Sequence, residues 1–282
     1  SPMNLMKVSI VSSVIFFMLR QSFLFLPGVS AKKEKVIWQH AADWNSFLAA
    51  ESIPGIAADT KHQFNSMIEE LKSAVYDDNL GLLAKLFPSA EQWRLYQDFR
   101  DEAVFLDIET GPRGDVTVVG MSDGETTKTF VQGINLDRQA LVDALKPYKL
   151  LVTFNGKSFD VPVLQKYFRI PFAMPHVDLK VVCGRLGYTG GLKVIEPQLG
   201  IKRPEELKHV TGQQAAELWR CWKATGDKDF FNMLIKYNEE DCINLKTIAD
   251  RLVPQLWEQT RNGTRVSVEL EAETLINKNE SV

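Results

Sequence analysis

Cysteine is scarce in this sequence. Its 282 residues contain three cysteines, Cys183, Cys221 and Cys242, and none of them belongs to a Cys-x-x-Cys pair. An odd number of cysteines without that spacing disfavours both a disulfide framework and a zinc site. We therefore expect core or incidental thiols.

An excess of basic residues is also missing. The 33 lysines and arginines are outnumbered by 36 aspartates and glutamates, which gives a formal net charge of −3. Any nucleic acid must then be bound through local basic patches, which argues against a tight, indiscriminate binder of duplexes. A hydrophobic share of 45% is ordinary for a globular protein, and the length allows one large core with a smaller module.

The apolar run near the N-terminus is too short to cross a membrane. It covers residues 8–19, contains three serines and is followed by Arg20 and Gln21. Lys7 and the small residues at 29–31 are typical of a secretory signal, but the interruption disfavours this interpretation. We expect a cytoplasmic protein whose first residues are an apolar extension or a tag-derived segment.

The most informative stretch is residues 103–111, which read A-V-F-L-D-I-E-T-G. Four apolar residues and a following Gly-Pro break predict a buried strand. Side chains alternate along a strand, so Asp107 and Glu109 share one face while their apolar neighbours point into a core. Such a pair repels unless it shares a proton or a cation, and oxygen ligands suit Mg²⁺ or Mn²⁺. Two solvated acids at a strand end are an equally open alternative.

The segments that follow predict an α/β domain. Residues 115–121 and 127–131 flank a Ser-Asp-Gly turn, so the first three strands are expected to form an antiparallel meander. A helix over 137–148 then leads to a second buried strand at 150–154, which returns beside the first. Residues 175–179 are expected to add a short edge strand.

The second buried strand is expected to end at Asn155. Ser158 can then cap a helix whose first turn contains Asp160. An acid at that place faces the crevice beyond the strand ends, where open α/β sheets bind ligands. Phe154 or Phe159 could stack on a base, but packing in the core is the favoured interpretation.

Near the C-terminus, apolar spacing over residues 227–253 predicts a long helix. Tyr237 and Asp241 lie four residues apart in it, so a phenol and a carboxylate point in the same direction. The alternative is that Tyr237 is a core aromatic and Asp241 a solvated acid.

Residues 22–99 predict an all-helical module. An apolar-Pro-Gly-apolar turn begins at Leu26 and again at Ile53, each followed by helix-forming residues. Helix-hairpin-helix elements of this kind offer backbone N–H groups to a phosphate, and Lys32 and Lys33 lie beside the first turn. A small bundle whose turns only connect helices is the equally open alternative.

Three motifs stand in order along the chain: D-I-E at 107–109, N-x-x-x-F-D at 155–160 and Y-x-x-x-D at 237–241. Together they resemble the motifs of DEDD 3′–5′ exonucleases of the tyrosine subclass, in the ribonuclease H-like superfamily. More closely, the chain resembles the YprB-like ribonuclease H-like family over residues 22–253. Segments that carry this resemblance include L-P-G at 26–28, T-F-N-G-K-S-F-D at 153–160 and H-V-D-L at 176–179.

This resemblance implies a fold and, together with the sequence pattern, a division of the chain, although it leaves the two ends unexplained. The fold is α/β, a ribonuclease H-like mixed five-stranded sheet flanked by helices, with an N-terminal all-helical module. The division assigns residues 1–21 to the extension, 22–99 to the helical module, 100–255 to an exonuclease domain and 256–282 to a C-terminal tail.

The resemblance also implies hydrolysis of phosphodiester bonds by a two-metal mechanism. Two divalent ions, Mg²⁺ or Mn²⁺, would be held by four carboxylates, Asp107, Glu109, Asp160 and Asp241. The phenol of Tyr237, with an ordinary pKa of about 10, would orient the attacking water rather than deprotonate it.

The substrate implied is the end of a single-stranded DNA or RNA, with no membrane partner. Phosphate contacts are expected from Asn155, Lys157 and Lys193, and from Lys32 and Lys33 in the helical module. A structure-selective endonuclease of the same fold and a non-catalytic nucleic-acid-binding protein are the alternatives. No motif separates DNA from RNA, because that choice depends on contacts near the sugar 2′ position.

Overall fold

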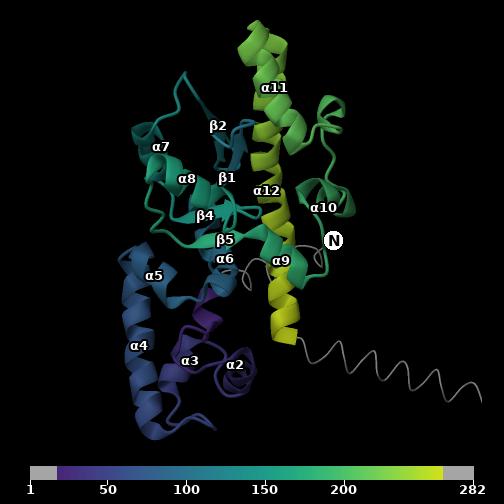
Figure 1. The fold of residues 1–282 in the computed structure, drawn as a ribbon. Coiled ribbons are helices and arrows are strands. Elements are labelled where there is room, and N and C mark those ends of the chain that lie inside the picture. The colour runs from purple at the N-terminus through teal and green to yellow at the C-terminus, as the bar shows by residue number, and fades with distance from the viewer. Residues whose placement is uncertain (1–17, 263–282) are drawn as a thin grey trace, which may run out of the picture.

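Five strands form one mixed sheet in the computed structural model, which describes residues 18–262 (Figure 1). The sheet order is β3-β2-β1-β4-β5. β1, β2 and β3 are antiparallel neighbours, whereas β4 lies parallel to β1 and β5 parallel to β4. The predicted α/β fold, with its meander, returning strand and edge strand, is confirmed. The strands are β1 Ala103–Thr110, β2 Val116–Ser122, β3 Thr127–Val131, β4 Leu150–Thr153 and β5 His176–Asp178.

The strand order follows from the connections. Tight turns join β1 to β2 and β2 to β3, and at the second turn the Asp123 carboxylate accepts hydrogen bonds from the backbone N–H groups of Glu125 and Thr126. Longer crossovers allow the parallel pairs to form. The helix α7 (Arg138–Leu145) connects β3 to β4, and α8 (Asp160–Phe168) connects β4 to β5.

Helices cover both faces of the sheet (Figure 1). On one face, Leu106 and Ile108 of β1 pack with residues of α7 and α8. On the other face, α12 (Lys228–Asn262) and α9 (Leu179–Arg185) pack against the residues of β1 that alternate with these, beginning with Phe105. The alternation of β1 therefore turns Asp107 and Glu109 toward α12.

The long helix α12 runs further than its sequence pattern predicts. We expected it to end near Val253 and the domain to end at residue 255, but it continues through Pro254 to Asn262. Leu256 and Trp257 are buried, so packing of the last turns outweighs the hydrogen bond that the proline removes. The part of the predicted tail after residue 262 lies outside the described residues.

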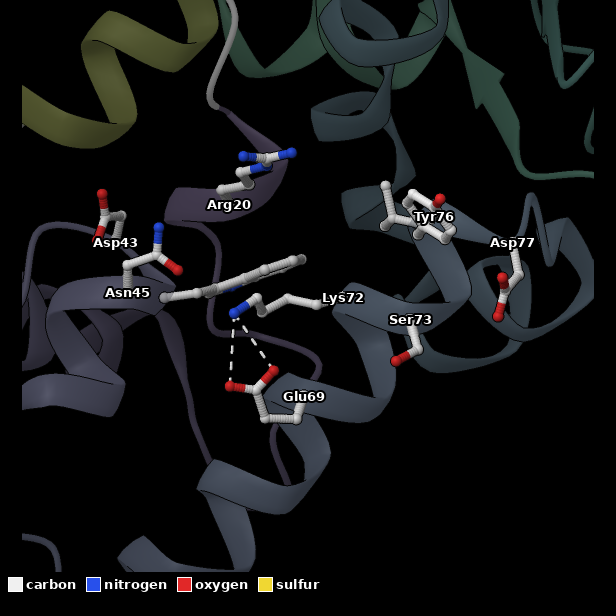
Figure 2. A pocket seen from close by; sticks show the side chains of 10 residues that line it. Arg20, Asp43, Asn45, Glu69, Lys72, Ser73, Tyr76 and Asp77 are labelled. Carbon is white, nitrogen blue, oxygen red and sulfur yellow. Dashed lines mark hydrogen bonds and ion pairs between the residues drawn. The ribbon is translucent and has the colours of Figure 1, made fainter.

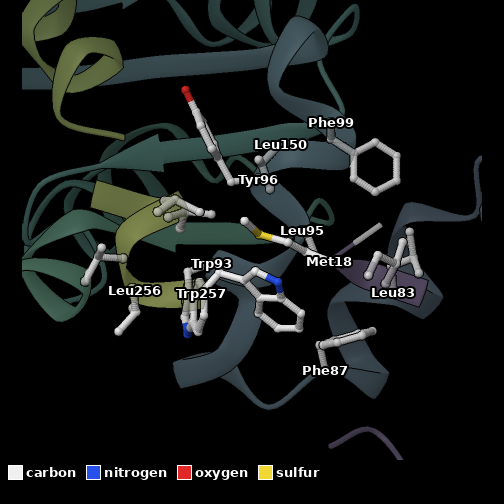
Figure 3. Close-up of a cluster of buried hydrophobic side chains, with 14 of the residues drawn as sticks. Met18, Leu83, Phe87, Trp93, Leu95, Tyr96, Phe99, Leu150, Leu256 and Trp257 are labelled. Atoms are coloured by element: carbon white, nitrogen blue, oxygen red, sulfur yellow. The ribbon is translucent and has the colours of Figure 1, made fainter. Parts of the chain in front are cut away.

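The residues before the sheet are helical, as predicted. They pack on the sheet domain through a shared hydrophobic core, in which Figure 3 shows Trp93 beside Trp257 of α12. Met18 and Leu19 are each 1% exposed in this core, so the predicted boundary at residue 21 falls inside packed structure. Residues 1–17, with most of the predicted extension, lie outside the described part of the chain. The elements here are η1 Leu19–Gln21, α2 Ala31–Trp38, α3 Trp44–Ala49, α4 Ala58–Tyr76, α5 Leu80–Leu86, η2 Ser89–Leu95, α6 Tyr96–Phe99 and η3 Arg100–Glu102.

The two Pro-Gly turns have the same geometry. In each, a backbone N–H donates to a carbonyl three residues earlier, from Val29 to Leu26 and from Ile56 to Ile53. The glycine between them takes a left-handed conformation, with φ 69° and 78°. The turns precede α2 and α4, so the repeated pattern corresponds to a repeated local structure. Phosphate binding by these turns stays a prediction.

Candidate functional site

The residues Asp107 and Glu109 of β1 are joined by Asp241 of α12. One carboxylate oxygen from each side chain lies within 4.8 Å of the others. Asp107 is partly buried, and Glu109 and Asp241 are buried. Acids that the sequence separates by more than 130 residues thus share one cluster, whose all-oxygen donor set could hold a hard divalent cation.

Close packing of α12 on the sheet depends on Gly120. This residue of β2 lies directly opposite Asp107 in the sheet. A Cβ atom there would lie 2.7 Å from Cys242 Sγ and would also overlap the side chain of Asn238. Glycine therefore lets α12 approach the strand pair closely enough for Asp241 to reach the acids of β1.

A polar contact from the same helix fixes Asp107. Asn238 Nδ2 donates to Asp107 Oδ2 at 2.9 Å and to the Asp107 carbonyl oxygen at 3.2 Å. Sequence reasoning missed this residue. The available signal was its position next to Tyr237 and three residues before Asp241, on the same side of the helix.

The fourth predicted acid, Asp160, approaches the cluster from α8. Its Oδ1 accepts a hydrogen bond from the backbone N–H of Ile108 at 3.2 Å, which ties α8 to the strand between the two acids of β1. Asp160 is buried, but it is not one of the three residues whose oxygen atoms lie within 4.8 Å of one another. The structure thus brings all four acids together near the C-terminal end of the central strand β1 and places three of them most tightly.

Two predictions about the start of α8 are wrong. Ser158 does not cap the helix, because the N-cap residue is Phe159 and no side chain caps it. The chain instead turns at Asn155, which has a φ of 66°, and the backbone N–H of Ser158 donates to the Asn155 carbonyl. Phe159 is 41% exposed beside Asp160 and is not a core residue, whereas Phe154 packs against the core as predicted.

This turn is held by Asp178 of β5. Its carboxylate accepts hydrogen bonds from the backbone N–H groups of Asn155 at 2.7 Å and Lys157 at 3.1 Å. The side chains of these two predicted substrate contacts also have partners. Asn155 Oδ1 accepts from Lys180 Nζ at 3.1 Å, and Lys157 Nζ donates to the Ser89 carbonyl oxygen.

Two cationic side chains border the acids. Lys193, on α10 (Leu192–Gln198), places its Nζ 3.7 Å from the centre of the Tyr237 ring and also donates to the Val210 carbonyl oxygen. Arg203 forms an ion pair with Asp241 and a second one with Glu196. Sequence reasoning missed Arg203 and Glu196, because neither lies in a motif or a periodic pattern.

Tyr237 occupies the border between this site and a third apolar cluster. That cluster packs the first turns of α12 against α11 (Gly212–Thr225) and the turn η4 (Glu205–Leu207). Burial raises the pKa of Tyr237 above its ordinary value, and the charge of Asp241 raises it further. The phenol therefore stays protonated at neutral pH. Tyr237 is both a buried aromatic and a neighbour of the acids.

Burial also raises the pKa of all four acids. At Asp107 the charges of Asp241 and Glu109 add to this effect, and the pKa of Asp160 rises to about 7. Arg203 and Lys193 oppose the rise of the pKa at Glu109 and Asp241 without cancelling it. The cluster therefore holds more negative charge than its protein neighbours balance, which favours a bound cation or proton.

The remaining predicted contacts, Lys32 and Lys33, lie on α2 in the helical region, apart from the sheet that carries the acids (Figure 1). A cavity of about 690 Å³ opens in the same region between η1, α3 and α4 (Figure 2). It contains none of the predicted site residues, and Lys72 at its wall pairs with Glu69 at 3.2 Å. No helix of residues 18–262 has the length and apolar character needed to span a membrane.

No curated protein matches this chain. Among solved structures, it is similar to the family B DNA polymerase from the hyperthermophilic archaeon Pyrobaculum calidifontis, with a TM-score of 0.46 and 19% identity. The similarity covers 56% of this chain and 25% of the polymerase, so the chain spans a quarter of that protein's length.

A family model gives the broader assignment. The model of the RNase_H superfamily named RNase_H_2 matches residues 104–253, which is more than half of the chain. The match begins in β1 and ends in α12, so it includes the acids of both elements and the turn before α8. On this match, the chain belongs to the RNase_H superfamily.

Proposed function

We propose that this protein is a metal-dependent 3′–5′ exonuclease that hydrolyses phosphodiester bonds of single-stranded DNA or RNA. The observation that carries the proposal is the meeting of Asp107 and Glu109 with Asp241 within 4.8 Å, in a chain of the RNase_H superfamily. More finely, we place the chain in the YprB-like family and in the tyrosine subclass of DEDD exonucleases. The same resemblance supports a helical module followed by an exonuclease domain that begins near residue 100, and the domain then includes α12 through Asn262.

The donor atoms fit a hard divalent cation. Asp107, Glu109 and Asp241 offer carboxylate oxygens only, and such ligands suit Mg²⁺ or Mn²⁺. Asp160 adds a fourth carboxylate from α8, which supports the proposal of two ions. Bound in this way, two ions supply Lewis acidity that activates water and stabilises the leaving 3′ oxygen.

The chain's own residues place the reactants. Asn238 holds Asp107, and the backbone N–H of Ile108 holds Asp160, so two of the acids keep fixed orientations. Tyr237 keeps its proton because burial raises its pKa, so its hydroxyl acts by hydrogen bonding to the attacking water rather than as a base. Its role is to orient that water.

Substrate contacts are proposed on both sides of the acids. Lys193 is the best placed of the predicted cations, since it lies against the ring of Tyr237. Phe159, exposed beside Asp160, offers a ring for stacking on a terminal base. Asn155 can donate from Nδ2 to a phosphate while its Oδ1 accepts from Lys180, and the ammonium of Lys157 has further hydrogens besides the one it donates to the Ser89 carbonyl.

The proposal is tested with end-labelled and circular single-stranded DNA and RNA, in Mn²⁺, Mg²⁺ or EDTA. We expect 5′-labelled linear strands to shorten stepwise and 3′-labelled strands to release labelled mononucleotide at once. Asp107→Ala and Asp241→Ala are expected to lower the rate at least about a thousandfold, since metal stabilisation of the transition state contributes several kcal/mol. The exposed acid Asp143 provides the matched control, and Asp143→Ala should keep the wild-type rate.

Other outcomes point to the alternatives. Cutting of circular strands would replace the exonuclease by a structure-selective endonuclease. Binding of strands without metal-dependent hydrolysis would leave a non-catalytic nucleic-acid-binding protein. Hydrolysis at the wild-type rate by Asp107→Ala would remove this cluster from the active site.

A further inference from the structure

Arg203 connects the acid cluster to a second buried acid. Its Nε donates to Glu196 Oε2 at 2.6 Å, and its Nη2 donates both to Glu196 Oε1 at 2.5 Å and to Asp241 Oδ1. Glu196 is 1% exposed and Arg203 is 9% exposed. The carboxylate of Glu196 therefore binds two nitrogens of the guanidinium, and one of these, Nη2, also donates to Asp241.

The anchor of this arm is itself tied to α12. Asn244 Nδ2 donates to Glu196 Oε1 at 3.0 Å, and Asn244 lies three residues after Asp241 on the same helix. Glu196 belongs to α10, and Arg203 follows it by seven residues. The chain from α10 to Arg203 thus closes on α12 at two points, through Asn244 and through Asp241.

Asp241 differs from its two partners in the cluster. Within residues 18–262, neither Asp107 nor Glu109 forms an ion pair, whereas Asp241 pairs with Arg203. Three carboxylates so close together repel, and a free side chain would turn toward solvent. The ion pair with Arg203 opposes that rotation for Asp241, the one acid of the three that lies on α12.

Burying the charged side chains of Asp241, Glu196 and Arg203 costs free energy. Burying two acids and a guanidinium costs several kcal/mol per ion, and apolar residues of similar volume often stabilise a fold at least as well. In addition, Arg203 Nη1 is buried and has no hydrogen-bond partner among the described residues. A purely structural role therefore leaves the guanidinium poorly explained.

We infer that Arg203 is a positioning residue: clamped by Glu196, it holds Asp241 against Asp107 and Glu109, so that the carboxylates are assembled before a divalent cation binds. This inference rests on the proposed metal binding at the cluster. It concerns affinity for the cation and can be tested without measuring hydrolysis.

The test is a double variant, Glu196→Gln/Arg203→Met, in the full chain. It removes one negative and one positive charge, so the net charge beside the cluster is unchanged and only the tie to Asp241 is removed. The matched control is Glu34→Gln/Arg94→Met, which removes an equally buried ion pair from the helical region. Isothermal titration calorimetry with Mn²⁺ gives the dissociation constant, and thermal unfolding in EDTA gives the stability of each variant.

We expect the Mn²⁺ dissociation constant of the Glu196/Arg203 variant to rise about 10- to 100-fold, the usual effect of losing a residue that orients a metal ligand. The control variant should keep the wild-type constant, even where its melting temperature falls. If the first variant does not fold, Arg203→Lys decides by the same measurement, because an ammonium cannot reproduce the forked contact with Glu196.

A folded Glu196/Arg203 variant that binds Mn²⁺ within about twofold of wild type overturns the inference. Equal weakening in both double variants does so too, because the effect would then follow stability. A wild-type protein that binds no Mn²⁺ removes both the metal site and the role of Arg203. A wild-type protein that binds Mn²⁺ but hydrolyses no strand overturns the exonuclease alone, and the inference is still decided by the variants.

Discussion

The helical region and the acid cluster at β1 and α12 both bury acidic side chains, but they balance the charge differently. In the helical region, Arg94 Nη1 donates to both oxygens of Glu34, at 2.8 and 3.0 Å, and Arg94 Nε donates to Glu91. At the sheet, four carboxylates face two cations, and one of these, Arg203, is shared with Glu196.

We interpret Glu34 as an acid that stabilises the fold, and the clustered acids at the sheet as ligands for a cation. In the helical region, Glu34 and Glu91 both contact Arg94 and Glu91 also contacts Arg185, so each of these acids has a cationic partner. Burial raises the pKa of Glu34 as well, but at the sheet the charges of neighbouring carboxylates raise the pKa values of Asp107 and Glu109 further, so that site favours an added cation or proton. Removing one acid should therefore have opposite effects on stability in the two regions.

The largest expected difference is between Glu34→Gln and Asp107→Asn, measured in EDTA. Glu34→Gln removes the more deeply buried of the two anionic partners of Arg94 and leaves it only Glu91, and breaking a buried pair of this kind typically costs about 3–5 kcal/mol. Asp107→Asn removes one of several repelling charges at nearly constant volume, so we expect an equal or higher free energy of unfolding. Urea unfolding followed by circular dichroism gives both values.

Nuclease activity should show the reverse order. Folded Glu34→Gln protein should hydrolyse strands at the wild-type rate, whereas Asp107→Asn should be inactive. If Asp107→Asn loses as much stability as Glu34→Gln, then Asp107 is a structural acid and the contrast between the two regions fails.

The next largest effect is expected for Tyr237→Phe. The ring remains in its apolar cluster, so stability should change little, and only the hydroxyl beside the acids is removed. We expect the turnover number to fall about 10- to 1000-fold, bounded by what a positioned proton-handling group contributes, while Mn²⁺ affinity stays near wild type. An unchanged turnover number would make Tyr237 a core aromatic with no part in the reaction.

The features that the sequence predicts correctly depend on residue spacing within a single strand or helix. Asp107 and Glu109 follow from the two-residue period of a strand, and Tyr237 and Asp241 from the four-residue spacing of a helix. The match of three such motifs in order also indicated the fold. Their meeting in space follows because the strand and the helix pack face to face.

The contacts that sequence reasoning missed join distant segments. Asn238 holds Asp107 across 131 residues, and Arg203 reaches Asp241 across 38. No local pattern marks such pairs, since the first depends on how closely α12 packs on β2 at Gly120 and the second on the segment that follows α10. The start of α8 was mispredicted for a related reason: the turn at Asn155 is held by Asp178 of another strand, which local capping rules do not include.

A smaller effect is expected from pH. Burial raises the pKa of Asp160 to about 7 from an ordinary value of 3.8, so the folded protein binds this proton more tightly than the unfolded chain. Between these values the folded state holds more protons, and its stability falls as pH rises. We expect the melting temperature in EDTA to drop between pH 5 and pH 8 by more in wild type than in Asp160→Asn.

The comparison with Asp160→Asn tests this group together with its effect on Asp107 and Glu109, whose pKa values its charge helps to raise. Asp98, whose pKa burial also raises to about 7, contributes in the same direction, and His176, whose pKa burial lowers to about 3, contributes in the opposite direction. Both groups are present in both proteins, so their effects cancel in the difference. Added Mn²⁺ should reduce the loss of stability above pH 7, because the cation binds the charged carboxylates. Identical pH profiles for the two proteins would show that Asp160 titrates normally.

The smallest effect should come from the helical region, through Lys32 and Lys33. Truncation before the sheet would expose the shared core that Figure 3 shows, so Lys32→Ala/Lys33→Ala is the cleaner test of phosphate binding. Removing one lysine that neutralises a phosphate should flatten the salt dependence of log K by about 0.7 on single strands, which gives about 1.4 for two. Fluorescence anisotropy at several salt concentrations measures this slope.

The matched control is Lys146→Ala/Lys166→Ala, at the end of α7 and on α8. If both variants keep the wild-type slope, the helical region only supports the sheet. If both flatten it equally, the lysines act through net charge. A flatter slope confined to the Lys32/Lys33 variant would show that the helical region itself binds the strand that the acid cluster hydrolyses.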